Sequence, residues 1–279
     1  MADPRILSLS ILLDPTGKDF LQHLYDGVIE NVEHSTLSGI LKNRDLSGEP
    51  SSGSVEAKRF ANAKSNSYGT ARAAGAGAHV KAKPVIIQID QDREIVEEIE
   101  YKDTVLYGVD GLLTRRSANH VRSMVRELER AFFQEAVTAG TTYTSTKTLP
   151  NEILESLILQ LETVQNDYVD GVPRDMISVV LAPETYSEVR NFLDTSVNNA
   201  NVNTAIGEFG RFHGVPVYSS IYLPAGVKRL ALIQTAVAQP VLPRPYTAEK
   251  IPLSEAYAVE LFYYFGTKAV TPDLIFSMS

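Results

Sequence analysis

The residue types that most often carry catalysis are present in this sequence but are not grouped. The chain has 279 residues and no cysteine, so it offers neither a thiolate nucleophile nor a thiolate metal site. Its histidines are far apart, and no two of them have the four-residue spacing that places two imidazole rings on one helix face. We therefore expect no histidine metal site. The five histidines are His23, His34, His79, His120 and His213.

Two short segments resemble ligand-binding loops but do not complete them. Residues 90–94 have the alternating acids of a calcium loop, but Ile95 stands where the sharp turn requires glycine. Residues 75–77 lack the third glycine of a dinucleotide fingerprint, with Val80 in its place, and they do not follow a strand. Neither a Gly-Lys-Ser/Thr phosphate loop nor a Gly-x-Ser-x-Gly elbow occurs. We expect no metal, no cofactor and no enzyme activity, with a dispersed active site as a remote alternative.

The composition is that of a globular protein, and it argues against a protein whose main task is to bind nucleic acid. Hydrophobic residues make up 44% of the chain, and the formal net charge is −8. A protein whose main task is to hold nucleic acid is usually basic, although a container for DNA need not be. No apolar run approaches the roughly 20 residues of a membrane span. The N-terminus lacks a basic start before an apolar block, so we expect no signal peptide and synthesis in a cytoplasm.

The charges are segregated along the chain. Residues 51–83 contain six bases and one acid, Glu56, and are rich in Ala, Gly, Ser and Asn. Such a segment cannot form a core by itself and should be extended. Residues 88–103 contain seven acids against Arg93 and Lys102. The bases of the first segment are Lys58, Arg59, Lys64, Arg72, Lys81 and Lys83, and the acids of the second are Asp90, Asp92, Glu94, Glu97, Glu98, Glu100 and Asp103.

The acidic segment overlaps two strand-like runs, at residues 85–89 and 95–101. The second run places Ile99 and Glu98 on opposite sides, as the period of two in a strand requires. Residues 90–93 have the composition of a turn. We therefore predict a long two-stranded hairpin. Two strands alone are at best marginally stable in water, so this hairpin needs another surface to lie against.

A helical period follows, at residues 113–137. Its apolar residues share one face, and three arginines lie in a stripe roughly opposite, at about 100° per residue. The stripe predicts either a binding face or a solvated one, and both readings stay open. The arginines are Arg115, Arg122 and Arg126; the apolar residues are Val121, Met124, Val125, Leu128 and Phe132.

The rest of the chain mixes helices and strands after a Thr/Ser-rich run at residues 141–148. Apolar spacing distinguishes the two kinds of element, and an Asn-rich stretch at residues 196–208 indicates a surface loop. A last pair of strands is expected, joined by Gly266-Thr267. We predict helices at residues 153–164 and 183–193, and strands at residues 177–181, 215–218, 230–234, 258–265 and 268–276.

Four short stretches stand in a characteristic order along residues 55–279. Tyr-Gly-Thr-Ala-Arg at 68–72 precedes the hairpin, and Glu-Ile-Glu-Tyr-Lys-Asp at 98–103 leads into the long helix. Gly-Val-Pro-Val at 214–217 is followed by Tyr-Leu-Pro at 222–224, and Gly-Thr-Lys-Ala-Val at 266–270 by Pro272. In these stretches and their order the chain resembles the major capsid proteins of tailed bacteriophages, which share the HK97-like fold.

The resemblance implies an α+β fold and a division of the chain. An N-terminal arm, expected to be loose and uncleaved, would occupy residues 1–54. An extended loop formed by the hairpin would occupy residues 55–105. A peripheral domain built on the long helix would comprise residues 106–148 and 251–279, and an axial domain residues 149–250.

The resemblance also implies a shell of hexamers and pentamers in a virion. The partners would be other copies of the chain, a separate scaffolding protein, a portal and non-specifically packaged DNA, with no membrane. An encapsulin-type nanocompartment shell is the alternative. Some relatives cross-link through a lysine and an asparagine, but no partner asparagine aligns with Lys81 or Lys83, so that activity is not carried over.

The segregated charges suggest where copies meet. Our hypothesis is that the acidic hairpin of one subunit docks near the arginine face of its neighbour's long helix, because complementary charge selects register and speeds encounter. The rival reading turns these arginines toward DNA or toward their own subunit. The expected interface residues are Arg72, Lys81, Lys83, Asp90, Asp92, Arg93, Glu94, Glu97, Glu98, Glu100, Arg115, Arg122 and Arg126.

Overall fold

The computed structural model describes residues 8–62, 67–68, 82–105, 107–194 and 210–279. Within these ranges no helix combines the length and the apolar character needed to cross a membrane. The α-helices are α1 (Pro15–Ser35), α2 (Leu37–Leu41), α4 (Tyr101–Thr104), α5 (Gly108–Ala139), α6 (Pro150–Glu162) and α7 (Pro183–Asp194). The strands are β1 (Ser54–Phe60), β2 (Ala82–Gln88), β3 (Gln91–Ile99), β4 (Thr141–Thr142), β5 (Ile177–Leu181), β6 (Arg211–Phe212), β7 (Val215–Ser219), β8 (Arg229–Ile233), β9 (Val237–Ala238), β10 (Val241–Pro243), β11 (Thr247–Lys250), β12 (Tyr257–Phe265), β13 (Lys268–Ala269) and β14 (Ile275–Met278).

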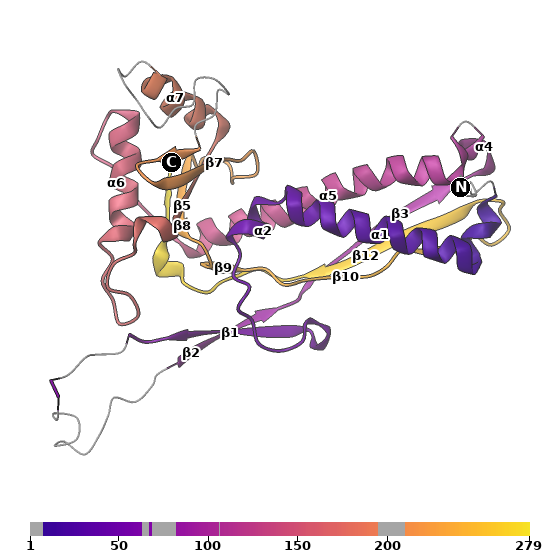
Figure 1. Cartoon of the computed structure of the whole chain (residues 1–279), viewed down its shortest axis with the longest axis horizontal. Coiled ribbons are helices and arrows are strands. Elements are labelled where there is room, and N and C mark those ends of the chain that lie inside the picture. Colours follow the sequence, from indigo (N-terminus) through magenta and orange to yellow (C-terminus); the bar gives the residue numbers. More distant parts are fainter. Residues whose placement is uncertain (1–7, 63–66, 69–81, 106, 195–209) are drawn as a thin grey trace.

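Two bodies and a projecting hairpin make up the molecule. Figure 1 shows an elongated body in which α1 and α5 lie along the long strands β3 and β12. The second body stands at one end of it and carries α6, α7, β5, β7 and β8. The hairpin of β1 and β2 projects below the place where the two bodies meet.

The long helix is the expected one, α5, with 32 residues where residues 113–137 were predicted. At about 1.5 Å per residue it is close to 48 Å long. Leu113, Met124, Leu128 and Phe132 are buried along its apolar face. It ends at Gly140, where a Cβ atom would lie 2.7 Å from the carbonyl oxygen of Ala136, so a larger residue would not fit.

The expectation of a loose N-terminal arm is wrong for the residues described. Helix α1 has 21 residues, begins with Pro15 in its first turn and packs along α5. It buries Leu21, Val28 and Val32 in the same core as the apolar face of α5. The spacing of seven and four residues between these three is that of one helix face. The sequence therefore carries a helical signal at residues 21–32.

The elongated body has a four-stranded sheet in which β3, β10 and β11 all pair antiparallel with β12. Along β12, buried residues alternate with half-buried ones. Val259, Leu261, Tyr263 and Phe265 point into the core shared with α1 and α5. The sheet and two helices therefore enclose one core, and the other sheet face is left outside.

The predicted hairpin was wrong in its pairing. Strand β2 pairs with β1, in the register Val55↔Ile87, and β3 pairs with β12, in the register Ile99↔Tyr257. Ile89 and Asp90 do not turn the chain back but carry it from one sheet into another. Alternation identifies a strand and its faces, but it does not identify the partner. The two strands that were predicted to form one hairpin, β2 and β3, therefore belong to different sheets.

The second body is built on a six-stranded sheet in the order β4-β14-β8-β5-β7-β6. The central strands β5 and β8 are buried at every position. Helices α6 and α7 share a core with them. The helices and strands predicted between residues 153 and 234 are confirmed, with ends shifted by a few residues. The Asn-rich stretch at 196–208 lies outside the described residues.

The last two strands do not pair with each other as predicted. Strand β12 ends at Phe265, β13 pairs with β9, and β14 joins the six-stranded sheet beside β8. Gly266 lies where the chain crosses between sheets. A Cβ atom there would lie 1.9 Å from the carbonyl oxygen of Gln88, which only glycine avoids. The Gly266-Thr267 pair is therefore a close crossing of β2 and not a hairpin turn.

Candidate assembly surfaces

The acidic residues of β3 divide between the two faces of the sheet. Asp92, Glu94 and Glu98 are exposed on the outer face, away from α5. They face the same way as Glu260, which is opposite Val96 in the β3–β12 register. We call Asp92, Glu94, Glu98 and Glu260 the acidic sheet face. Three of its members are exposed and Glu260 is half-buried.

Glu97 points the other way, into a polar cluster beneath the sheet. The Nε of Arg116 on α5 donates to both carboxylate oxygens of Glu97, at 2.9 and 2.8 Å. His120 Nε2 lies 3.3 Å from Oε1, and His120 Nδ1 lies 2.6 Å from the hydroxyl of Tyr246. The sequence predicted that Glu97 contacts a neighbouring subunit, but its partners are in its own chain.

The electrostatics of this cluster follow from burial and from Arg116. The hydrogen bonds from Arg116 hold the pKa of Glu97 below its usual value. Burial lowers the pKa of His120, which keeps the imidazole neutral, and burial raises the pKa of Tyr246. A carboxylate, a guanidinium, a neutral imidazole and a phenol thus join α5 to β3 and to the segment before β11.

The three arginines predicted on α5 differ in their surroundings. The guanidinium of Arg115 lies 4.3 Å from the ring centre of Tyr107, a cation–π contact within one subunit. Arg122 and Arg126 are exposed, and among the described residues neither has a carboxylate within 4.0 Å. Arg93, from the inner face of β3, reaches Glu127 on α5 at 3.3 Å. Of the stripe, Arg122 and Arg126 are left available for another molecule.

The remaining predicted interface residues are scattered. Lys83 is exposed on β2, and Asp90 is exposed between β2 and β3. Glu100 pairs with Lys102 at 2.5 Å and caps the short helix α4. Arg72 and Lys81 lie outside the described residues. The structure therefore brings the acids of β3 together but does not unite all thirteen residues in one surface.

One contact that sequence reasoning missed holds the outer end of β1 against the rest of its own subunit. Arg59 on β1 donates to Asp273 at 2.7 Å, and its guanidinium lies 4.3 Å from the ring centre of Tyr168. Asn166 binds the same carboxylate. Arg59 and Asp273 are 214 residues apart, so no local pattern could have joined them.

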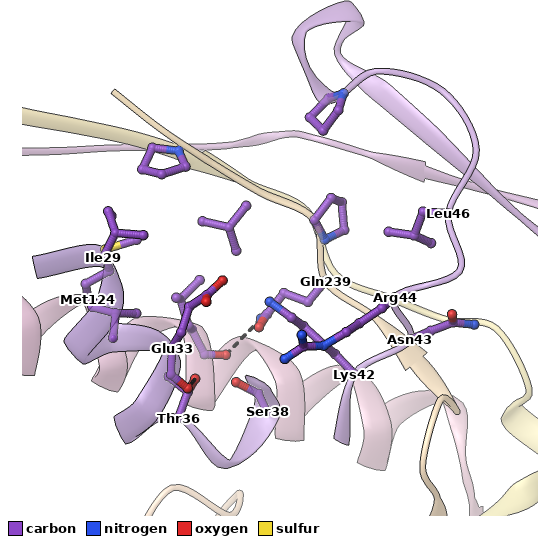
Figure 2. Close-up of a pocket in the computed structure, with 16 residues that line it drawn as sticks. Ile29, Glu33, Thr36, Ser38, Lys42, Asn43, Arg44, Leu46, Met124 and Gln239 are labelled. Atoms are coloured by element: carbon purple, nitrogen blue, oxygen red, sulfur yellow. Dashed lines mark hydrogen bonds between the residues drawn. The ribbon is translucent and has the colours of Figure 1, made fainter. Parts of the chain in front are cut away.

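A second missed feature is a cavity of about 240 Å³ between α1, α2, α5 and β10. Figure 2 shows Ile29 and Met124 on one side and Lys42 and Arg44 reaching in from the other. Gln239 donates to the carbonyl oxygen of Leu128 at 2.9 Å across the cavity floor. Burial lowers the pKa of Lys42. Within the described residues no three His, Asp or Glu side chains are grouped to hold a metal ion.

No protein-family model matches this sequence, and no curated protein matches it significantly. Solved structures do match it in three dimensions. A chain from Mycobacterium phage Che8 gives a TM-score of 0.63 at 19% identity, over 88% of this chain and 91% of that one. The capsid structure of the Cyanophage P-SCSP1u gives a TM-score of 0.63 at 14% identity, over 88% of each chain. This chain has the HK97-like capsid fold.

The same fold also matches a crystal structure of a virus-like particle from Pyrococcus furiosus. The TM-score is 0.54 at 12% identity, over 94% of this chain and 98% of that one. The α+β HK97-like fold class and the resemblance to tailed-phage capsid proteins are confirmed at the level of the fold.

Proposed function

We propose that this chain is a major capsid protein whose copies assemble as hexamers and pentamers into an icosahedral phage head around double-stranded DNA. The observation that carries the proposal is a capsid fold with a projecting hairpin that its own subunit covers only in part. Along β2, one residue of seven, Ile87, is fully buried, while Ile86 and, at the far end of β1, Phe60 are more than half exposed. Two strands need further packing to be stable, and an adjacent copy would supply it.

The proposed role is structural, without catalysis. A separate scaffolding protein and a portal would accompany the shell, which would form in the host cytoplasm and leave in the virion. DNA would be enclosed without specific contacts, which fits a chain of net charge −8.

A nanocompartment shell is the second candidate, because the fold also matches a virus-like particle over 98% of that chain. The content of the particles separates the two. Particles should be isolated from cells that carry the natural neighbouring genes, treated with nuclease and analysed for DNA and protein. We expect nuclease-resistant DNA in tailed particles. Tail-free particles that hold an enzyme and no DNA would overturn the phage-head proposal.

The contact between copies is a proposal of its own. We propose that the acidic sheet face of one subunit meets Arg122 and Arg126 of the next, because both surfaces are exposed and of opposite charge. This keeps the docking hypothesis for Asp92, Glu94 and Glu98 and removes Glu97 from it, since Arg116 already holds that carboxylate.

Charge reversal tests this contact. In the double variant Arg122→Glu/Arg126→Glu, we expect the subunit to keep its circular dichroism spectrum and to lose most of its particle yield in sucrose gradients. Arg211→Glu, an exposed arginine of β6 in the other body, is the matched control and should assemble normally. Normal particle yield from the double variant would exclude these arginines from the interface.

A further inference from the structure

The six-stranded sheet contains a buried arginine without a counter-charge. Arg229, at the start of β8, is 6% exposed, and it lies beside Met278 of β14 and Leu181 of β5. Its Nε has no hydrogen-bond partner, and one terminal nitrogen has only the Met278 sulfur, at 3.9 Å. A thioether is a weak acceptor. Among the described residues no carboxylate lies within 4.0 Å of this guanidinium.

This arrangement is unfavourable unless something compensates it. A buried charge needs a paired charge or a full set of hydrogen bonds. Burial lowers the pKa of Arg229, and the negative charge of Glu188 offsets this only in part. Glu188 is itself exposed on α7. The guanidinium therefore keeps unused donors inside the protein.

A cavity of about 210 Å³ adjoins Arg229 and is open to further donors. The linker that follows α5 contributes Thr142, Thr144 and Lys147 to its lining, whose side chains end in hydroxyls and an ammonium group. Ser145 also lines it, but its hydroxyl is already bonded to Ser156 at 2.8 Å. No aspartate or glutamate side chain lines this cavity. Ser279, the last residue of the sequence, also lines the cavity, and its backbone carboxylate competes with an anion for Arg229 and Lys147. These two cations outnumber it, so the lining still favours an anion.

We propose that the Arg229 cavity binds a small oxyanion, for which inorganic phosphate is the probe. A guanidinium presents parallel N–H groups that match two oxygens of a phosphate or carboxylate. A water molecule occupies about 30 Å³ in the liquid, so the cavity has room for a tetrahedral oxyanion with water around it. The threonine hydroxyls and Lys147 would bind the remaining oxygens. This site lies apart from the acidic sheet face and does not depend on the shell function.

Calorimetric titration of the full-length, unassembled protein with phosphate tests the site. The titration is run at pH 7 and constant ionic strength, with chloride as the balancing anion. We expect saturable binding at one site per chain, and at least a ten-fold loss of affinity in Arg229→Met. Arg211→Met, in an exposed arginine of the same sheet, should bind as the wild type does. Glu188→Gln should bind severalfold more tightly, because a competing negative charge is removed.

Two further variants keep the test decisive if Arg229→Met does not fold. Arg229→Lys keeps the charge but not the paired donors, and Thr142→Val/Thr144→Val removes hydroxyls from an exposed wall. Each should weaken phosphate binding severalfold. Absence of saturable binding by the wild type would overturn the proposal. So would wild-type affinity for phosphate in both Arg229→Lys and Thr142→Val/Thr144→Val.

Discussion

At the scale of single residues, Glu97 is the acidic residue of β3 that faces the inside of its own subunit, whereas Asp92, Glu94 and Glu98 are exposed. It lies on the same side of β3 as Ile95 and Ile99, and Arg116 and His120 meet it there. The alternation of the strand already placed Glu97 with these isoleucines, so the signal was available from the sequence. Its partners were not, because they lie on a different element.

The two charges of this pair should not be equally costly to remove. Arg116→Met leaves a carboxylate buried beside a neutral imidazole, and we expect a loss of about 1–3 kcal/mol in the free energy of unfolding. Glu97→Gln leaves Arg116, whose side chain is 44% exposed and can be solvated, so its cost should be smaller. Urea unfolding of both variants measures the order. A larger loss in Glu97→Gln would contradict the assigned geometry.

His120 should make the subunit less stable in mild acid. Its pKa is lowered in the folded state from the ordinary 6.5, so below that pH the unfolded chain takes up a proton that the folded chain refuses. Stability therefore falls as pH drops through about 6.5. The lowered pKa of Glu97 has the same sign, at lower pH.

The measurement is the urea midpoint of the wild type and of His120→Gln between pH 7.5 and 5. The wild type should lose stability across this range, and the variant should lose less. An equal decline in the two proteins would show that His120 is not the responsible group.

At the scale of elements, local patterns were enough for some parts of the fold and not for others. Helices α5, α6 and α7 and the strands between them could be predicted because each is coded by its own periodicity. The pairing of β3 with β12 could not, since more than 150 residues separate Ile99 from Tyr257. The exposure of Arg122 and Arg126 followed from the helical period, whereas the Arg59–Asp273 contact had no sequence signal.

Hydrogen exchange distinguishes the elements that are covered within one subunit from those that become covered only when subunits assemble. Helix α1 shares a core with α5, so its amides should be protected equally in unassembled subunits and in shells. Strand β2 is exposed at five of its seven residues and the outer end of β1 at Lys58 and Phe60, so the amides of these parts should gain further protection in shells. Full protection of β1 and β2 in the unassembled subunit would contradict the need for an adjacent copy.

At the scale of the whole molecule, the structure separates what is finished within one chain from what is not. The elongated body has one hydrophobic core, and the body with the six-stranded sheet has another. A third, smaller cluster, which includes Val55 and Ile87, joins the hairpin base to the rest. The acidic sheet face and Arg122 and Arg126 lie outside these cores. Under the proposed function, the partly exposed hairpin and the two oppositely charged surfaces are what the subunit offers to other copies of itself.

Electron cryomicroscopy of the purified protein tests the central claim most directly. The account predicts closed shells, or their five- and six-membered rings, with the β1–β2 hairpin of each copy resting on the next. A population of single subunits alone, at high protein concentration and with the scaffolding partner co-expressed, would contradict it.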